Sequence, residues 1–246
     1  MLVSAFHVFL QQRLAVDPPK QKGQRTRARL VAAAAKGLED KGYHALRISD
    51  ITAEAELAEG SFYVYFKDKT EIAVEALTLF FEDYVDQTMR PVADATAFDR
   101  IRTSNRQWIA VCRANPGMMR CALQVGDYVP EFAVVAQRTG RRWYEIVASS
   151  VQRRRSVPGG GDIALLTSYL LASMADEMAR KLIVMPDEGF LELLDRLGGG
   201  DETLADSISV VWHRLIYGDV PAAADLSPAV ADLSRFLAGA TERAGA

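Results

Sequence analysis

The sequence contains few of the residues on which disulfide scaffolds and metal centres depend. It has two cysteines, Cys112 and Cys121, and three histidines, His7, His44 and His213, among 246 residues. The cysteines lie nine positions apart, a spacing that matches no metal or redox motif, so we expect two buried thiols. We expect no metal ion and no other cofactor, and the cytoplasmic location inferred below argues against a structural disulfide.

Long hydrophobic runs are also missing. Residues 2–10, LVSAFHVFL, are apolar but too short to span a bilayer, and they lack the basic start and cleavage site of a signal peptide. We interpret residues 1–21 as an N-terminal extension, with room for a short amphipathic helix before Pro18 and Pro19. With 49% hydrophobic and 25% charged residues, the composition is typical of a soluble, cytoplasmic helical protein.

The chain has no recognisable catalytic signature. The three histidines are isolated in sequence, and no HExxH, GxSxG, phosphate-loop or dinucleotide fingerprint is present. We therefore predict that the protein is not an enzyme, although one sequence leaves open an active site assembled from distant residues. No strand pattern and no internal repeat stands out either.

Residues 47–69, RISDITAEAELAEGSFYVYFKDK, have the pattern of two short helices joined by a tight turn. Ile48, Ile51 and Ala55 form one apolar stripe on the first helix, and Phe62 and Phe66 form another on the second. If Phe62 and Phe66 face the core, then Gly60, Ser61 and Val64 point outwards, with Tyr63 and Tyr65 on the flanks. An outward face this small fits the major groove of DNA.

At these residues the chain resembles the TetR family of bacterial transcriptional regulators. The resemblance covers roughly residues 24–73 and includes the break at Lys41-Gly42-Tyr43 and the segment GSFYVYFKDKTEI. Its most specific part is the spacing of Gly60, Phe62-Tyr63, Phe66 and Lys69.

The resemblance implies an all-α protein with an N-terminal three-helix module, which contains a helix-turn-helix, and a larger C-terminal helical bundle. We assign residues 1–21 to the extension, 22–69 to the DNA-binding domain, and 70–246 to a ligand-binding and dimerisation domain. Charge agrees with this division, because residues 1–69 carry a net charge of +3 and the remainder −6. The function implied is a ligand-responsive regulator, in the family's commoner mode a repressor that a small molecule releases from a palindromic operator.

In the DNA-binding domain, Lys69 is expected to hold a phosphate together with the free N–H groups of the helix that it begins, and Arg47 is a second phosphate candidate. Tyr63 and Ser61 can reach a phosphate or base edge, whereas Gly60 permits close approach of the backbone. The predicted DNA-contacting residues are Arg47, Glu59, Gly60, Ser61, Tyr63, Val64, Tyr65 and Lys69.

Three residues depart from the family's usual pattern. Glu56 stands where glycine commonly makes the turn, and a left-handed conformation there costs roughly 1 kcal/mol. Ala58 replaces a capping serine or threonine, and Glu59 places a carboxylate near phosphates unless it accepts from cytosine N4. The alternative function is therefore a helical ligand-binding or interaction protein with weakened DNA binding.

The remaining sequence predicts successive helices. Asp68 is expected to cap a helix from Lys69 towards Met89, with Glu71 completing a capping box and Pro91 ending the helix. Further helices are predicted over residues 98–114, 116–125, 131–154, 162–184, 187–197, 202–217 and 228–239.

Aromatic residues and methionines recur on several of these helices and form a reasonable lining for a mostly apolar pocket. Each one alone is more often ordinary core. The predicted ligand is apolar or amphipathic, and its identity is not encoded in any motif. The predicted ligand-binding residues are Phe81, Tyr84, Trp108, Cys112, Met118, Trp143, Met174 and Met178.

Helices 162–184 and 202–217 are predicted to form a homodimer interface. Leu166, Leu170, Met174 and Met178 repeat at every fourth position, and Ile163, Leu165, Tyr169 and Leu171 add apolar surface, so this helix must be covered on several sides. On the second helix we expect a buried stripe that leaves two residues free to face a partner. The expected stripe is Leu204, Ile208, Val211 and Leu215, and the expected free residues are Trp212 and Ile216.

Overall fold

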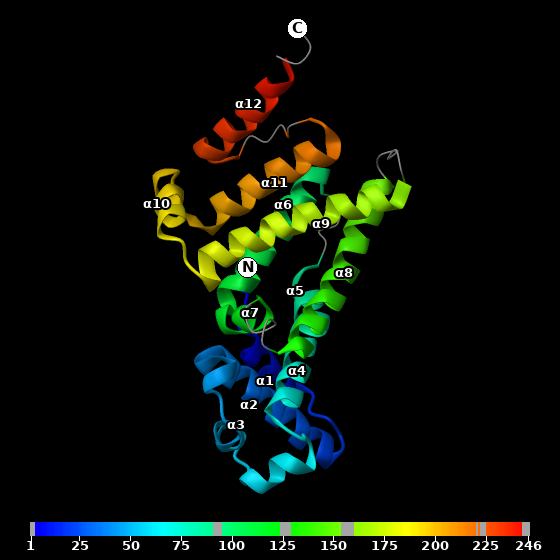
Figure 1. The fold of residues 1–246 in the computed structure, drawn as a ribbon, viewed down its shortest axis with the longest axis vertical. Helices are drawn as coiled ribbons and strands as arrows, with labels where there is room; N and C mark the ends of the chain where they lie inside the picture. Colours follow the sequence, from blue (N-terminus) through cyan, green and yellow to red (C-terminus); the bar gives the residue numbers. More distant parts are fainter. Residues whose placement is uncertain are drawn as a thin grey trace. The chain divides into compact units, whose positions relative to one another are not determined.

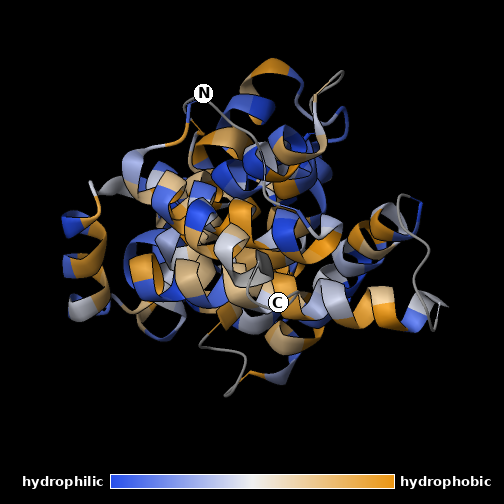
Figure 2. Ribbon diagram, turned by 90° about the horizontal axis from the view of Figure 1, so that it is seen from above, coloured by the Kyte–Doolittle hydropathy of each residue, from blue (hydrophilic) through white to orange (hydrophobic). Residues whose placement is uncertain are grey.

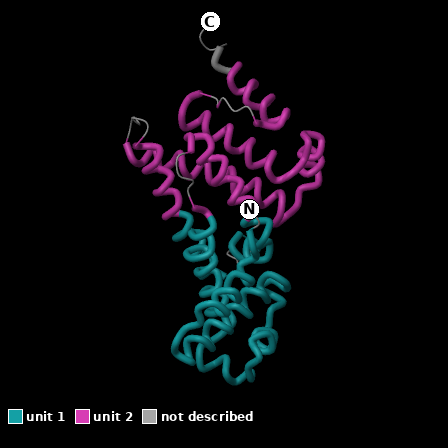
Figure 3. The backbone as a smooth tube through the Cα atoms, turned by 180° about the vertical axis from the view of Figure 1, so that it is seen from behind, with its two compact units in different colours: residues 1–88, 111–140 teal, residues 89–110, 141–246 magenta. Residues whose placement is uncertain are grey.

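The computed structural model describes residues 3–90, 95–123, 129–153, 160–219, 221 and 225–242. All regular elements in this part of the chain are helices, which confirms the predicted all-α class (Figure 1). The chain forms two compact units: unit 1 contains residues 1–88 and 111–140, and unit 2 contains residues 89–110 and 141–246 (Figure 3). These divisions differ from the boundaries at residues 21 and 69, which stay a prediction.

Unit 1 holds the N-terminal helices together with α7 and the first half of α8. Its elements are α1 (Phe6–Val16), α2 (Lys22–Ala45), α3 (Ile48–Glu54), the 3-10 helix η1 (Glu59–Val64), α4 (Lys69–Leu79), the π-helix η2 (Phe80–Val85), α5 (Asp86–Thr88), α7 (Pro116–Leu123) and α8 (Pro130–Gln152). Unit 2 holds the second half of α8 and most of α6 (Ala97–Ala114), followed by α9 (Gly160–Ala179), the π-helix η4 (Arg180–Val184), α10 (Glu188–Arg196), α11 (Gly200–Tyr217) and α12 (Pro228–Glu242).

These bounds match the predicted helices within a few residues, except that π-helical turns interrupt two of them. Residues 124, 125 and 154 of the predicted ranges lie outside the described residues. Hydrophobic and hydrophilic residues alternate along most ribbons, as expected for helices with one face in a core (Figure 2).

Helix α2 is the central element of unit 1 and packs against α1, α3, α4 and α7. Its buried side chains include Leu30, Val31 and Leu38, and α4, which packs against it, contributes the fully buried Ile72 and Leu77. The predicted break appears within α2 at residue 42, where glycine adopts φ 73° and the helix bends before its last residues. Only glycine adopts this conformation without a steric cost from Cβ.

The predicted N-terminal extension forms α1, which is docked in the core of unit 1. Phe6 is fully buried, and its ring meets the ring of Phe80 edge-to-face with centroids 5.4 Å apart. The backbone N–H of Phe6 donates to Asn115 Oδ1 at 2.6 Å, and the Tyr84 hydroxyl donates to the carbonyl of Ser4. The extension therefore braces the helix that follows the DNA-binding module.

That following helix begins with the predicted cap, because the Asp68 carboxylate accepts from the N–H of Glu71 at 2.9 Å. The Glu71 carboxylate accepts from the N–H of Lys67 at 2.6 Å, one residue before the cap, so the predicted capping box does not form. The helix continues through η2 and α5 to Thr88, and its π-helical turn carries the aromatic residues Phe80, Phe81 and Tyr84.

A second connection joins α2 to α7. The Glu39 carboxylate on α2 accepts hydrogen bonds from the N–H groups of Gly117, at 2.8 Å, and Met118, at 3.1 Å. These N–H groups lie in the first turn of α7, where the helix dipole favours a negative charge. A Cβ at position 117 would lie 2.4 Å from the Cα of Glu39, so only glycine permits this approach.

In unit 2, α11 buries a different face from the predicted one. Leu204 and Ile208 are buried as expected, but Leu215 is 58% exposed, whereas Trp212 and Ile216 are 4% and 6% exposed. The assignment of Trp212 and Ile216 to a partner-facing side was therefore wrong. The large Trp212 ring packs against Trp143 at a centroid distance of 5.9 Å, which turns Leu215 outwards.

Helix α12 covers another side of α11, where Phe98, Val210 and Val230 form a small buried cluster. Between α6 and α11 runs a polar seam. Asp206, 3% exposed, accepts from both Arg102 and Arg106, and Asn105 donates to Ser209 Oγ at 3.0 Å. Every charge in this seam is paired, as buried charges must be.

We predict that Gly117→Ala destabilises the protein by about 1–3 kcal/mol, because the new methyl group meets backbone atoms of Glu39 that cannot move alone. Urea denaturation measures the change. Gly189→Ala is the matched control, since its methyl group would find only an Asp187 carboxyl oxygen at 3.6 Å. Equal stability of the two variants would contradict the close packing of α2 on α7.

Candidate functional site

The start of α3 is held by a charged network on the module's surface. The Asp50 carboxylate accepts from the backbone N–H of Arg47 at 3.0 Å and from Lys41 Nζ at 2.7 Å. These contacts lower the pKa of Asp50, with the Lys41 hydrogen bond as the largest cause. The Arg47 side chain itself is exposed at the N-terminal end of the helix.

The turn after α3 has the geometry that the sequence predicts. Glu56 adopts φ 53°, the left-handed conformation expected at this position, and it is the one non-glycine residue with positive φ among those described. The Arg29 guanidinium donates to the carbonyl of Ala55 at 2.6 Å and pairs with the Glu56 carboxylate at 3.3 Å. Arg29 therefore stabilises the turn and partly neutralises the unexpected acid.

The second element of the motif is the 3-10 helix η1, where an α-helix was predicted. It contains six residues, and Ala58 offers no side-chain hydrogen bond to its first turn. Phe62 and Phe66 are buried as predicted, with ring centroids 5.7 Å apart, and the Arg27 guanidinium lies 4.2 Å from the Phe66 ring centroid. A short segment without a side-chain cap tightens readily into 3-10 geometry.

The outward face of η1 consists of the predicted residues. Tyr63 is 59% exposed and Val64 is 75% exposed, while the space around Gly60 contains no atom within 4 Å of an added Cβ. Glu59 is exposed and Ser61 is half-buried. The buried Phe62 and Phe66 therefore hold η1 so that Gly60, Tyr63 and Val64 form an exposed ridge with few polar groups.

Tyr65 differs from Tyr63. It is half-buried, its ring lies 3.9 Å from a Cβ built at Gly23, and its carbonyl accepts from Arg27 at 2.7 Å. Its packing against α2 holds the end of η1, and its role on DNA stays a prediction.

Lys69 has internal partners. Its Nζ donates to the carbonyls of Tyr43 at 2.8 Å and Leu46 at 3.0 Å, and lies 4.5 Å from the Tyr43 ring centroid. Burial lowers its pKa. The ammonium therefore ties the end of α2 to the start of α4 with two of its three N–H donors, and its contact with a phosphate stays a prediction.

The predicted ligand-binding residues divide between the two units. Phe81, Tyr84, Cys112 and Met118 lie in unit 1, whereas Trp108, Trp143, Met174 and Met178 lie in unit 2. Tyr84, Cys112 and Met118 are buried, and both cysteines are buried thiols outside any disulfide, as predicted. One pocket lined by all eight residues stays a prediction.

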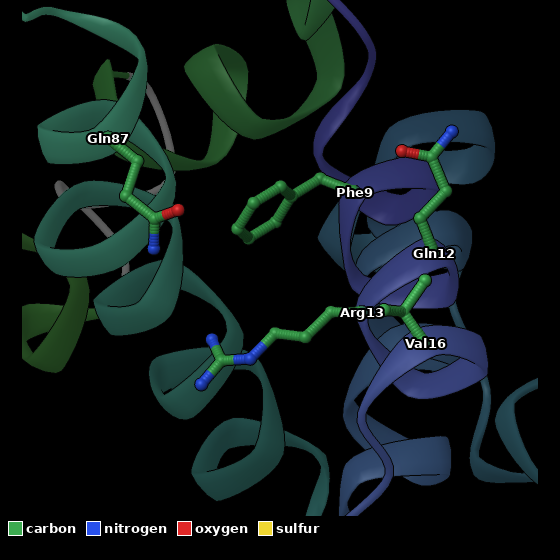
Figure 4. Close-up of a pocket in the computed structure, with 5 residues that line it drawn as sticks. All are labelled: Phe9, Gln12, Arg13, Val16 and Gln87. Carbon is green, nitrogen blue, oxygen red and sulfur yellow. The ribbon is translucent and has the colours of Figure 1, made fainter.

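Unit 1 contains an open hollow of about 470 Å³ between α1 and α5, lined by Phe9, Gln12, Arg13, Val16 and Gln87. Phe9 and Arg13 extend from α1 towards the helix that carries Gln87 (Figure 4). Arg13 also pairs with Asp83. None of the eight predicted ligand-binding residues lines this hollow.

Unit 2 contains a largely buried carboxylate that sequence reasoning did not single out. Asp176 lies on α9, and its side chain is hydrogen-bonded to Trp108 of α6. Burial raises the pKa of Asp176 to about 6, opposed by the Trp108 hydrogen bond. An acid within an otherwise apolar helix was the available signal, but the sequence left open whether Asp176 or Glu177 faces inwards.

The N-terminal module matches known proteins. The family model for bacterial regulatory proteins of the tetR family matches residues 30–76, the segment that contains α3 and η1. Residues 30–76 therefore resemble the DNA-binding domain of TetR-family regulators. Members of this family are transcriptional regulators and not enzymes, which agrees with the predicted lack of enzymatic activity.

A curated relative gives the same result for this region. The chain is 39% identical over 61 residues to the uncharacterised HTH-type transcriptional regulator YdgC of Bacillus subtilis (strain 168). The match spans 25% of this chain and 31% of that relative's length.

Solved structures extend the likeness of the fold to most of the chain. A putative TetR-family transcriptional regulator from Mesorhizobium loti aligns with a TM-score of 0.60 at 16% identity, covering 80% of this chain and 98% of that one. The fatty acid degradation regulator FadR of Bacillus halodurans aligns with a TM-score of 0.58 at 14% identity, over 81% and 98% of the two chains. FadR of Bacillus subtilis in complex with stearoyl-CoA gives 0.56 at 14% identity, over 77% and 97%.

We predict that Asp176→Asn stabilises the protein above pH 7. The folded-state pKa of Asp176, about 6, lies above the ordinary value of 3.8, so the folded protein retains a proton that the unfolded chain releases. This acid's contribution to stability is therefore complete below about pH 4 and is lost as the pH rises through 6. The charged, buried carboxylate costs on the order of 2–3 kcal/mol above pH 7, and asparagine removes this cost.

Urea denaturation at pH 4 and pH 7.5 tests this prediction, with no gain expected at the lower pH. Glu177→Gln is the matched control, because Glu177 is its neighbour on α9, pairs with Arg180 and has a lowered pKa. The control should change stability by less than about 1 kcal/mol. A loss of stability in Asp176→Asn at pH 7.5 would refute the buried, uncompensated state of this acid.

Proposed function

We propose that the protein is a cytoplasmic, ligand-responsive repressor that binds a palindromic operator as a homodimer. The observation that carries the DNA-binding proposal is the exposed face of η1, where Gly60, Tyr63 and Val64 project over the buried Phe62 and Phe66. Such a ridge on a net positive module is shaped for the major groove.

One feature favours DNA binding over the alternative function, a helical ligand-binding or interaction protein with weakened DNA binding. The left-handed turn at Glu56, one basis of that alternative, is stabilised by the pairing of its carboxylate with Arg29. Arg47, exposed at the start of α3, has no acidic hydrogen-bond partner for its side chain in the described part of the chain and is the best candidate for a direct phosphate contact.

The proposed dimer uses an apolar stripe on α9. Ile163, Leu166 and Leu170 follow the spacing i, i+3, i+7 and are 46%, 55% and 66% exposed. Leu215 of α11, turned outwards, adds apolar surface. Large apolar side chains gathered on one helix face favour a protein partner, and a two-fold contact with a second copy pairs this stripe with itself.

Ligand binding is proposed for unit 2, around Trp108, Trp143 and Met174. The FadR relative was solved with stearoyl-CoA, which supports a site for an amphipathic molecule in a protein of this fold. Helix α6 carries Trp108 in unit 2 and continues into unit 1, where Asn115 and α7 meet α1 and α2. A ligand that shifts α6 can therefore move α7 and, through Glu39, the DNA-binding module. A coupling of this kind is typically worth about 1–3 kcal/mol and is reciprocal.

We predict that Tyr63→Phe weakens binding to DNA from the region upstream of the protein's own gene by about tenfold, because the exposed hydroxyl loses one charge-assisted hydrogen bond. Fluorescence anisotropy of labelled DNA measures the change. Tyr65→Phe is the matched control and should alter affinity less, since its ring is packed against α2. A larger effect at Tyr65 would show that the exposed ridge of η1 is not the surface that meets DNA.

We predict that Leu166→Glu converts the dimer into a monomer, because a charge in the centre of the α9 stripe meets its own copy across the two-fold axis. The side chain is exposed, so folding of the monomer is not affected. Sedimentation equilibrium at micromolar concentration measures the mass. The same change at Val134, 59% exposed in unit 1, is the control and should leave a dimer. A wild-type monomer, or a dimeric Leu166→Glu variant, would remove α9 from the interface.

A further inference from the structure

Two acids in unit 2, the buried Asp206 and the half-buried Asp176, are treated in opposite ways. Asp206 accepts hydrogen bonds from two arginines, Arg102 and Arg106, and its pKa is lowered. Asp176 has no lysine, arginine or histidine partner among the described residues, and Trp108 is the one side chain that is hydrogen-bonded to it. A buried carboxylate without a cation is costly, and acids of this kind concentrate at functional sites.

Two aromatic residues interact with this acid, Trp108 of α6 and Tyr144 of α8, and further rings pack against Tyr144. The phenol of Tyr144 on α8 lies within electrostatic reach of Asp176 and Tyr169, and together with burial, the largest cause, they raise its pKa. The rings of Tyr144 and Tyr169 lie 4.3 Å apart between centroids, and Trp143 lies 6.1 Å from Tyr144. All three tryptophans of the chain, including Trp108 and Trp212, belong to this aromatic cluster.

The cluster has a second polar group without a partner. Trp212 is 4% exposed, packs against Trp143, and its indole N–H has no hydrogen-bond acceptor among the described residues. In addition, α9 changes to the π-helix η4 one turn after Asp176, and such turns often accompany functional sites. An acid without a cationic partner in an aromatic cluster is what a site for a cationic ligand group would show, whereas the indole N–H of Trp212 needs a hydrogen-bond acceptor, which an ammonium does not supply.

We propose that Asp176 is the anchor for the cationic head of an amphipathic organic amine, which the aromatic cluster of Trp108, Trp143, Tyr144, Tyr169 and Trp212 encloses. This inference rests on the proposed ligand-responsive function and names its ligand class. The ammonium of the ligand pairs with Asp176, which has no cationic side chain beside it among the described residues. The faces of the aromatic rings also attract cations. The apolar tail packs on the rings and on nearby methionines.

The charge of the head group distinguishes this ligand from other amphiphiles. A fatty acid or an acyl-CoA carries a negative head, which the Asp176 carboxylate repels at this position. A fatty alcohol has the same tail without charge. The three probes decylammonium, decanol and decanoate therefore differ in charge while keeping one chain length, and they separate the contribution of Asp176 from that of the apolar cluster.

The test is a titration of the full-length protein with each probe below its micelle concentration, followed by tryptophan fluorescence and by calorimetry. We expect decylammonium to bind at least about tenfold more tightly than decanol, and decanoate to bind more weakly than both. Asp176→Asn keeps the shape and removes the charge, so decylammonium should lose about tenfold while decanol is unchanged. Glu177→Gln, which removes the charge of the neighbouring acid that pairs with Arg180, should change neither.

Three results would overturn the proposal. They are the absence of binding by decylammonium, an equal affinity for decylammonium and decanol, and an unchanged decylammonium affinity in Asp176→Asn. The same samples titrated with labelled upstream DNA separate this site from the wider function. Loss of DNA binding in the wild type would refute the repressor while leaving the amine site standing. Intact DNA binding with no amine binding would do the reverse.

Discussion

The Glu39 carboxylate accepts two N–H hydrogen bonds at the start of α7, and the placement of the DNA-binding module within unit 1 depends on this contact. The negative charge of Glu39 complements the positive N-terminal end of α7. Because Gly117 has no Cβ, the backbones of α2 and α7 lie too close together for any side chain at this position. Helix α2 therefore cannot slide on α7 without breaking both contacts. Since α2 also packs against α1, α3 and α4, any movement of α7 is passed to the whole module.

The same helix α6 connects this joint to the aromatic cluster of unit 2. Its Trp108 is hydrogen-bonded to Asp176, and its last turn leads directly into Asn115 and α7. The protein balances one buried acid, Asp206, with arginines and leaves Asp176 unbalanced. The ionised Asp176 carboxylate lacks a cationic partner, and a ligand with a positive charge lowers the free energy of the protein by pairing with it. This pairing is the physical basis of the proposed response to an amine.

The sequence predicts best where local chemistry decides the structure. The Asp68 cap, the left-handed Glu56 and the buried pair Phe62 and Phe66 depend on residues within a few positions of one another, and all three are confirmed. Prediction failed at α11, because this helix is apolar on several sides and two stripes fit its period equally well. The size of Trp212 and the covering helix α12 selected the buried face, and both are tertiary effects.

The residues of the candidate sites likewise fall into those that the local sequence predicts and those that depend on tertiary contacts. The exposed ridge of η1 was readable from spacing, whereas the internal partners of Lys69 come from the end of α2, more than 20 positions away in the sequence. The roles of Glu39 and Asp176 likewise depend on partners from other helices, namely Gly117 and Trp108. No short motif encodes such pairs, so they emerge only from the packed structure.

The central claim is that this chain reads a two-fold DNA site through η1. Its most direct test is a titration of DNA from the region upstream of its own gene at several salt concentrations, with a scrambled fragment of equal length as competitor. The account predicts saturation at two protomers per site and a preference for the upstream fragment that persists as salt rises. Equal affinity for both fragments at every salt concentration would contradict it.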